Sequence, residues 1–301
     1  MEKVCVLMST YNGEKFIEEQ LDSVLAQKDC VVRLLVRDDG SSDGTTQILD
    51  KYKSEGKLDW YTGKNLKPSL SFLDLLYQAQ DCDYYAFCDQ DDIWDNDKLV
   101  SAVEKLRIYG DKPAFYHSNA KLADSQGKDS GRPLHNSDPK LNLFSVGLSG
   151  GILGCTMVFN RALRELIVSA KAPEKTIMHD FYVGLVCLAC GGTGVYDNTA
   201  HIRYRQHGGN VLGVAIDIKS KIKSKLNQFL KKEQFTICEQ AEDVLERYSD
   251  KMTNDGIKVC KRIAHHRDNI FRTIATAFSP KAHFSSFKNS MFIRACLLFR
   301  R

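Results

Sequence analysis

Residues 84–94 read Tyr-Tyr-Ala-Phe-Cys-Asp-Gln-Asp-Asp-Ile-Trp, an apolar strand pattern that ends in the three carboxylates of Asp89, Asp91 and Asp92. Carboxylates this close repel one another unless a cation neutralises them. The cation that usually accompanies an Asp-x-Asp loop is Mg²⁺ or Mn²⁺, which also bridges the phosphates of a substrate. The alternative interpretation is a solvated acidic turn that caps a helix beginning near Asp95.

Two earlier segments repeat this pattern of a strand followed by a polar loop. An apolar strand pattern at residues 4–8 leads into Ser-Thr-Tyr-Asn-Gly at 9–13, and a second at 31–36 leads into Arg-Asp-Asp-Gly-Ser-Ser-Asp-Gly-Thr at 37–45. In an open parallel sheet, ligands bind outside the carboxyl ends of the strands. Three polar loops at that edge therefore predict a single binding site.

Strand and helix patterns alternate up to about residue 116, with strands expected at 58–61 and 114–116 and helices at 69–79 and 95–109. Such alternation predicts an α/β domain with a doubly wound sheet. Residues 124–142 are rich in Gly, Ser, Asp and Asn, and we expect a long surface loop there. No Gly-x-Gly-x-x-Gly follows the first strand, which argues against a dinucleotide site.

Composition is that of an ordinary globular protein: 301 residues, 43% hydrophobic and 27% charged. The net charge of +4 is too small to indicate nucleic-acid binding. The longest apolar stretch, residues 181–190, is too short to span a bilayer, and the chain opens directly in a strand pattern without a secretion leader. We therefore expect a cytoplasmic protein whose ten cysteines are reduced.

Three motifs together resemble the family 2 glycosyltransferases, which have the GT-A fold. They are Ser-Thr-Tyr-Asn-Gly at 9–13, Asp-Asp-Gly-Ser-Ser-Asp-Gly-Thr at 38–45 and Asp-Gln-Asp-Asp at 89–92, in the family's order. The resemblance covers roughly residues 3–215 and implies a doubly wound mixed sheet flanked by helices. It also implies a nucleotide-sugar donor and Mg²⁺ or Mn²⁺, and it makes residues 148–159 an acceptor-side strand.

Further matches resemble the bacterial rhamnosyltransferase-like branch of that family. They are Asp-Gln-Asp-Asp-Ile-Trp at 89–94, Met-His-Asp at 178–180 and Tyr-Arg-Gln-His-Gly-Gly-Asn-Val-Leu-Gly at 204–213. The resemblance implies dTDP-β-L-rhamnose as the donor. Related branches that use other donors share much of this pattern, so a UDP-hexose donor stays open.

The resemblance also assigns the metal and nucleotide contacts. Asp91 matches the metal ligand of the family's Asp-x-Asp, and Asp89 would hold the ribose or the metal through water. Thr10 and Tyr11 would contact the base, although Tyr11 could instead pack on the following helix. Asp39 would accept from the imide N–H of a uracil or thymine, for which a carboxylate is a good acceptor. Asp92 is a weaker candidate for a metal ligand, and its alternative role is to cap the next helix.

Asp180 matches the position of the family's catalytic base. A single-displacement, inverting mechanism needs one carboxylate to deprotonate the attacking hydroxyl, and a helix start favours the ionised carboxylate. The alternative is that Asp180 only caps the helix. His179 is expected to be a packed or acceptor-side neighbour. In relatives a basic loop closes over the diphosphate, so Arg205 would neutralise its charge and His207 would bind the metal or a phosphate. A surface turn without a role is the alternative.

Composition changes after about residue 215, which divides the chain into a catalytic domain (1–215) and a basic helical extension (216–301). Residues 217–232 contain six Lys and one Asp, and residues 286–301 contain four basic side chains and no acid. Apolar residues of the last segment fall on one broad helical face, and Ile293 and Leu297 interrupt the edge of that face. A basic helix with exposed aromatics suits an anionic membrane surface. A structural cap or a dimer contact is the alternative.

The sequence thus predicts an inverting glycosyltransferase that extends a cell-surface glycan or a lipid-linked saccharide precursor, at the inner face of the cell membrane if the extension binds it. Two readings from other classes remain. A sugar nucleotidyltransferase also pairs an Asp-x-Asp with a doubly wound sheet, but no Gly-rich Arg/Lys loop opens this chain. A carbohydrate-binding relative without activity is disfavoured, because the metal and base positions all carry carboxylates.

Overall fold

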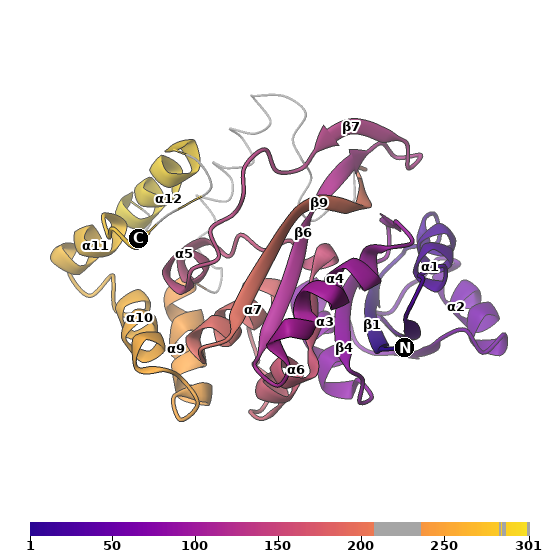
Figure 1. Cartoon of the computed structure of the whole chain (residues 1–301), viewed down its shortest axis with the longest axis horizontal. Coiled ribbons are helices and arrows are strands. Elements are labelled where there is room, and N and C mark those ends of the chain that lie inside the picture. The colour runs from indigo at the N-terminus through magenta and orange to yellow at the C-terminus, as the bar shows by residue number, and fades with distance from the viewer. Residues whose placement is uncertain (208–235, 283, 285–286, 300–301) are drawn as a thin grey trace.

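The computed structural model describes residues 1–207, 236–282, 284 and 287–299. The predicted boundary at residues 215/216, the Lys-rich stretch at 217–232 and the Gly-Gly part of the 204–213 motif lie outside these residues. Within them, the chain forms one mixed sheet with helices on both faces, and a group of C-terminal helices gathers at the end of the molecule away from α1 and α2 (Figure 1).

The described strands form a nine-stranded sheet in the order β3-β2-β1-β4-β8-β6-β9-β5, with β7 paired to β6. Neighbours β3, β2, β1 and β4 are parallel, whereas β8 is antiparallel to both β4 and β6. The strands are β1 (Lys3–Thr10), β2 (Val31–Asp38), β3 (Asp59–Thr62), β4 (Tyr84–Asp89), β5 (Ile93–Trp94), β6 (Ala114–Ala123), β7 (Asp129–Pro133), β8 (Val158–Asn160) and β9 (Thr193–Arg205).

Strand register brings the three predicted loops to one edge. Thr10 at the end of β1 pairs with Asp38 at the end of β2. Ser9 pairs with Asp89 at the end of β4. The polar segments that follow these strands therefore begin side by side, as expected for a parallel sheet with its site at the carboxyl edge.

Separate sets of helices cover the two faces because side chains alternate along each strand. Val4, Val6 and Met8 of β1 enter one core, with helices α1 (Ile17–Leu25), α2 (Thr45–Ser54) and α4 (Lys98–Leu106). Cys5 and Leu7 enter the other, with helices α3 (Lys67–Gln78), α6 (Arg161–Val168) and α7 (His179–Ala189). The doubly wound mixed sheet predicted from the sequence is confirmed.

Two local predictions differ from the structure. Residues 124–142 were expected to be a loop, yet β7 forms there and pairs with an extended β6. Residues 148–159 were expected to be a strand, but they comprise the end of helix α5 (Leu143–Ser149), a 3-10 turn at Gly154–Thr156 and the short β8. The physical reason is glycine: Gly150 and Gly151 have φ of 67° and 78°, a left-handed conformation that ends α5 and that a strand does not use.

Helices α9 (Ile237–Tyr248) and α10 (Asn254–Ala264) share a core with the sheet. Thr236 and Glu239 form a capping box at the start of α9. Val244 of α9 and Ile263 of α10 are fully buried in the same cluster as Leu185 of α7. A Cβ on Gly147 of α5 would come within 2.5 Å of Ile263 Cδ1, so α5 and α10 are in close contact. These two helices are therefore part of the catalytic core.

The last two described helices, α11 (Ile270–Ala277) and α12 (Phe287–Phe299), lie beside each other at one end of the molecule (Figure 1). In α12, Leu297 is 5% exposed and Ile293 packs on the core, whereas Met291 is exposed. Ile293 and Leu297, which interrupt the edge of the apolar face expected from the sequence, are one turn apart and lie on the side of α12 that packs on the core. None of the helices in the described ranges combines the length and apolarity needed to cross a bilayer.

We predict that α10 unfolds together with the catalytic sheet. Ile263→Ala removes fully buried methyl groups from the shared core and should lower the free energy of unfolding by about 2–5 kcal/mol. The matched control is Ile270→Ala, whose side chain is exposed and should change stability by less than about 0.5 kcal/mol. Urea denaturation measures both. An unchanged midpoint for Ile263→Ala would show that α10 is not part of the folding unit.

Candidate active site

A cleft of about 400 Å³ lies at the carboxyl ends of β1, β2 and β4. Six of the residues predicted from the sequence line it, and they come from four segments far apart in the chain. Its walls include Thr10, Tyr11, Asp39, Asp89, Asp91 and Asp180. The structure thus brings together the predicted nucleotide, metal and base positions, while Arg205 and His207 lie behind the Asp89–Asp92 loop.

The β1 loop is held by side chains of neighbouring strands. Thr10 is buried, and its Oγ1 donates to Asp38 Oδ1 at 3.0 Å. Tyr11 is 50% exposed, so its ring is available to a ligand. Gln90 fixes the backbone of Tyr11, because its Oε1 accepts from Tyr11 N at 2.9 Å and its Nε2 donates to Tyr11 O at 3.1 Å. A Cβ on Gly13 would come within 2.3 Å of Gln90 Oε1, so a larger residue there would displace the Gln90 side chain.

Asp39 is buried at the cleft wall and already bonds to the protein. Its Oδ2 accepts from Leu66 N at 3.0 Å, and its Oδ1 accepts from Ser71 Oγ at 3.1 Å. Arg37 forms an ion pair with the same carboxylate. A carboxylate has about four acceptor sites, so one further N–H can still be accepted. The predicted contact with a pyrimidine imide is compatible with this geometry.

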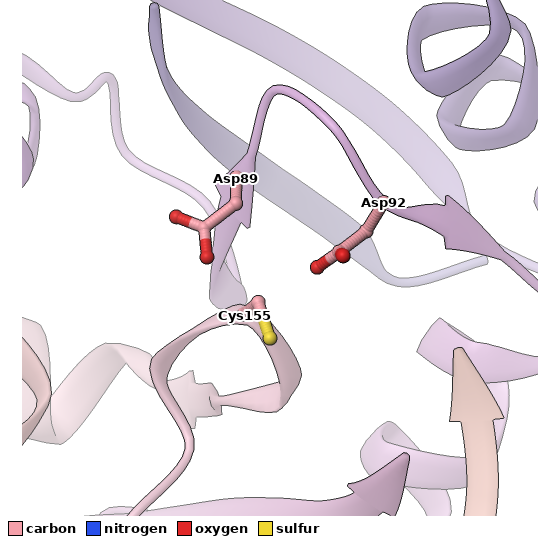
Figure 2. A group of neighbouring side chains, drawn as sticks. All are labelled: Asp89, Asp92 and Cys155. Atoms are coloured by element: carbon pink, nitrogen blue, oxygen red, sulfur yellow. The ribbon is translucent and has the colours of Figure 1, made fainter. Parts of the chain in front are cut away.

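The acidic loop after β4 contains a cluster of possible metal-ligand atoms. Donor atoms of Asp89, Asp92 and Cys155 all lie within 4.8 Å of one another. Figure 2 shows the two carboxylates on either side of the loop between β4 and β5, with the Cys155 thiol below them on the 3-10 turn. Asp92 and Cys155 are buried, whereas Asp89 is half-buried and faces the cleft.

Charge repulsion and burial raise the pKa values of the groups in this cluster. The pKa of Asp89 rises to about 7 because burial disfavours its charge and because Asp91 and Asp180 are near. Burial also raises the pKa of Asp92 and of the Cys155 thiol well above their usual values. A protonated Cys155 is a poor metal ligand, so the carboxylates of Asp89 and Asp91, which line the cleft, fit a hard cation better.

Asp92 does not cap a helix, contrary to the alternative considered from the sequence. Helix α4 begins at Lys98, six residues further on, and its N-terminal flanking residue is Asp97. Asp92 Oδ1 instead accepts from Arg205 N at 3.1 Å. This bond ties the acidic loop to the end of β9.

Arg205 reinforces that connection with its side chain, which is 2% exposed. Nε donates to Asp91 O at 2.8 Å, and Nη1 donates to Ser125 O at 3.1 Å. Nη2 forms an ion pair with Glu19 Oε2 at 2.6 Å. These contacts favour a positioning role for Arg205, whose predicted contact with the diphosphate remains untested.

His207 lies against the outer side of the predicted metal ligand. Its Nε2 is 2.7 Å from Asp91 Oδ2, and its ring stacks on Phe16 with centroids 4.6 Å apart. A carboxylate oxygen and an imidazole nitrogen are thus placed side by side. Carboxylate and imidazole are both donors that transition-metal ions accept, and the metal role of His207 stays a prediction.

Lys98 is a buried cation behind the acidic loop that sequence reasoning missed. It is fully buried, and its Nζ lies 3.7 Å from the centroid of the Trp94 ring. Burial lowers its pKa to about 8, while Cys88, Cys155 and Asp92 favour the charged form. The sequence does not signal this burial, because lysines at helix starts are normally solvated.

Asp180 occupies the first turn of α7 and is 8% exposed. Its Oδ1 accepts from Phe181 N at 2.7 Å. Burial raises its pKa to about 6, against the opposing effect of bonds from the backbone of Phe181 and Gly154. A Cβ on Gly154 would lie 3.0 Å from Asp180 Oδ2, so glycine allows this close approach. A carboxyl group with this pKa is mostly ionised at neutral pH, as a general base requires.

His179 lines the cleft beside Asp180 but is enclosed by aromatic rings. Its ring packs on Phe72 and Phe87, with centroids 4.1 and 4.6 Å away. Burial lowers its pKa to about 3, so the imidazole is neutral. Among the described residues, neither ring nitrogen has a hydrogen-bond partner. It is thus a packed neighbour, as predicted.

A second groove, of about 650 Å³, meets the first cleft at Asp180. The two share Ile152, Leu153, Met178 and Tyr204 as well. The groove is mainly apolar, with polar groups that include His135 and Arg267. Its far wall is formed by Phe292, Ile293, Cys296 and Leu297 of α12.

Sequence reasoning also gave no role to two residues that line the cleft. Gln90 lies within the acidic motif, but its contact with Tyr11 spans 79 positions and could not be read from local pattern. Lys67 starts α3 with a φ of 62°, which is uncommon for a residue with a side chain. Strain of this kind is often found at ligand sites, and it is visible only in the structure.

Comparisons with known proteins agree with this geometry. The family described as Glycosyl transferase family 2 matches residues 5–167, more than half of the chain. The dTDP-rhamnosyl transferase RfbG of Shigella flexneri is 29% identical over 231 residues, which are 72% of this chain and 77% of that protein. The glucosyltransferase WfaP of Escherichia coli, whose name specifies UDP-Glc and an α-D-GlcNAc-diphosphoundecaprenol acceptor, is 25% identical over 214 residues, 70% of this chain and 80% of that protein.

Solved structures show the same fold. The mannosyltransferase PcManGT from Pyrobaculum calidifontis, in complex with GDP-Man and Mn²⁺, superposes with a TM-score of 0.55 at 15% identity, over 93% of this chain and 72% of that chain. At this identity the likeness concerns the fold, which is GT-A. Together with the family match, it decides against the sugar nucleotidyltransferase considered from the sequence. The chain belongs to glycosyltransferase family 2 and is a glycosyltransferase of the GT-A fold.

Proposed function

We propose that the protein is an inverting glycosyltransferase that moves L-rhamnose from dTDP-β-L-rhamnose onto a lipid-linked saccharide precursor of a cell-surface glycan. The observation that carries this proposal is the position of Asp180 where the cleft that contains Asp89 and Asp91 meets the mainly apolar groove. A base at such a junction can reach an acceptor hydroxyl that enters from the groove while the donor occupies the cleft.

The donor part of the proposal follows from the cleft and from one relative. Tyr11 presents an exposed ring for a base, and Asp39 presents a carboxylate for an imide N–H, which thymine and uracil both have. RfbG is named as a dTDP-rhamnosyl transferase, and its similarity extends over 72% of this chain. WfaP, named for UDP-Glc, keeps a UDP-hexose as the alternative donor.

A divalent cation at Asp91, with His207 and Asp89 beside it, would act as a Lewis acid on the leaving diphosphate. The raised pKa of Asp89 supports a cation there, because a positive charge would relieve the repulsion among Asp89, Asp91 and Asp180. Arg205 would hold the loop that carries Asp91, through its bond to the Asp91 carbonyl. The buried Lys98 would lower the cost of keeping Asp92 beneath this loop.

In the proposed reaction, the acceptor oxygen attacks the anomeric carbon as the bond from that carbon to the diphosphate breaks. The acceptor proton passes to the carboxylate of Asp180. One displacement at carbon inverts its configuration, as in inverting glycosidases. His179 remains neutral and contributes shape, since burial keeps its pKa low.

The acceptor part rests on the groove. Its lining is mainly apolar, which suits a lipid chain, and Arg267 offers a cation for a linking phosphate. WfaP is named for an acceptor that is linked to undecaprenol through a diphosphate. An acceptor of that chemistry would place its sugar at Asp180 and its lipid along α12.

The proposed donor is tested by incubating the enzyme with dTDP-β-L-rhamnose, UDP-glucose and UDP-GlcNAc and measuring release of the nucleoside diphosphate. We expect dTDP release to exceed UDP release at equal donor concentration, and dTDP-rhamnose to raise the unfolding temperature most, by mass action. Preferential release of UDP would indicate a UDP-hexose donor in place of the proposed dTDP-rhamnose. No release with any donor, even when acceptor is supplied, would contradict the proposed reaction.

Asp180→Asn should abolish transfer while leaving donor binding nearly unchanged, because the base acts on the acceptor hydroxyl. General base catalysis is worth about 10²- to 10⁴-fold, so the transfer rate should fall by that factor. Asp39→Asn is the reciprocal control and should weaken donor affinity, because the proposed contact of Asp39 is with the imide N–H of the nucleobase. Calorimetry measures donor affinity, and product formation measures transfer.

The pH dependence gives a second readout for the same residue. Because burial raises the pKa of Asp180 to about 6, the wild-type kcat/KM for the acceptor should fall as the pH is lowered through about 6, where the carboxylate becomes protonated. The residual activity of Asp180→Asn should lack the part of this decline due to Asp180. Transfer by Asp180→Asn at the wild-type rate would place the base elsewhere.

Asp91→Asn should weaken Mn²⁺ binding in the presence of dTDP by at least about tenfold, and His207→Ala should weaken it by about 10- to 100-fold if it is a ligand or supports one. Mn²⁺ binding is measured directly by electron paramagnetic resonance, and transfer is measured with and without chelator. The control is Asp97→Asn, a carboxylate that is 60% exposed and pairs with His201 outside the cleft. Equal Mn²⁺ affinity of Asp91→Asn and the wild type, or full activity in chelator, would contradict the proposed metal site.

A further inference from the structure

In helix α11 the usual arrangement of side chains is reversed: polar side chains are buried and large apolar ones are exposed. Its buried residues are Thr273, Thr276 and Ala277, two of which carry hydroxyls. Its large apolar side chains point to solvent: Ile270, Phe271 and Ile274 are 58%, 79% and 44% exposed, and Phe278 just after the helix is 58% exposed. At 100° per residue these four positions fall within one arc of about 100°. A helix normally buries such an arc.

The exposed arc continues onto the neighbouring helix. Met291 of α12 is 56% exposed. Ile270, Phe271, Ile274, Phe278 and Met291 together make up five of the nine large apolar side chains that are exposed among the described residues. A concentration of this kind marks an interaction surface, whereas single exposed apolar residues do not. We call these five residues the docking face.

Basic side chains lie around the docking face. The sequence from 261 to 301 contains nine Lys or Arg and one acid, Asp268. Arg272 and Lys281 are 57% and 59% exposed and pair with Asp268 and Asp255, respectively. Lys288 is exposed, and the guanidinium of Arg294 lies 5.6 Å from the centroid of the Phe278 ring. An apolar helical face with a basic rim is the pattern of helices that lie in the interface of an anionic bilayer.

We propose that the docking face binds the surface of a membrane that contains anionic lipids. A second copy of the chain fits less well, because an isologous contact would set the basic rim against itself and like charges across an interface are unfavourable. An acidic lipid surface supplies both the apolar depth for Phe271 and Phe278 and the negative charge for the rim.

This surface lies next to the groove that reaches Asp180. Helix α12 contributes Met291 to the docking face, and its Phe292, Ile293, Cys296 and Leu297 line the groove. A bilayer in contact with the docking face would therefore meet the end of the molecule from which a lipid-linked acceptor enters. This last link rests on the proposed function, whereas membrane binding itself does not.

The test uses the full chain and sedimentation with vesicles, in the absence of donor. We expect the wild type to bind vesicles of phosphatidylglycerol and phosphatidylethanolamine, and to bind phosphatidylcholine vesicles at least tenfold more weakly. The double variant Phe271→Ser with Phe278→Ser should lose at least tenfold in partition onto the anionic vesicles. The matched control, Ile108→Ser, removes an apolar side chain that is 81% exposed elsewhere, and its partition should stay within twofold of the wild type.

Release of nucleoside diphosphate and the unfolding midpoint, measured in solution, serve as readouts of fold and site and should be unchanged in all these variants. Arg272→Gln with Lys288→Gln should weaken binding to anionic vesicles and reduce its salt dependence. Three outcomes would overturn the proposal: no binding of the wild type to anionic vesicles at low salt, equal binding by the Phe271/Phe278 variant, or a solution dimer that this variant dissociates. Failure of the donor assay alone would count against the proposed function and not against the docking face.

Discussion

Repulsion among carboxylates at the carboxyl end of β4 is the constraint on which the site depends. Asp89, Asp91 and Asp92 follow one strand, and Asp180 is near enough to raise the pKa of Asp89. The protein meets part of this cost with groups behind the loop. Asp92 accepts from the backbone of Arg205, and the buried ammonium of Lys98 lies beyond it. On the cleft side the repulsion between Asp89 and Asp91 is not offset in this way, and the proposed divalent cation would relieve it.

The position of the base depends on a different part of the molecule. Asp180 begins α7, whose Leu185 shares a core with Val244 of α9 and Ile263 of α10. Gly147, Gly150 and Gly154 allow α5 and the turn after it to approach Ile263, Phe181 and Asp180 closely. The helices that follow the sheet in the sequence therefore fix where Asp180, the proposed base, stands. They also provide α12 as a wall of the groove, so the proposed base and the proposed acceptor surface are parts of one packed unit.

Sequence reasoning predicted the sheet edge because three strands end in polar residues, and strand register must bring such ends together: Thr10 pairs with Asp38 and Ser9 with Asp89. It could not predict contacts that depend on distant segments. The bond between Asp92 and Arg205 joins positions 113 apart, so the local pattern around Asp92 suggested a helix cap instead. Lys98 escaped notice for the same reason, since only the packed fold shows that this lysine is enclosed. The prediction of a strand in the α5–β8 region was wrong because apolar content alone does not distinguish a strand from a helix. Gly150, in the left-handed conformation, ends α5 there.

The C-terminal helices show why polarity along a sequence cannot by itself identify a membrane-binding face. Both α11 and α12 contain enough apolar residues to form a face, and the basic residues near them are similar. In α12 the apolar residues lie on all sides of the helix. Ile293 and Leu297 therefore pack on the core, whereas Met291 stays exposed. In α11 the hydroxyls of Thr273 and Thr276 turn inward, where Thr273 Oγ1 donates to His266 O at 2.8 Å, and the phenyl rings remain in water. Exposure of Phe271 and Phe278 carries a hydration cost on the order of 1.5–3 kcal/mol each relative to burial. The proposed membrane surface would offset this cost, because it supplies an apolar phase in which the two rings leave water while the threonines stay buried.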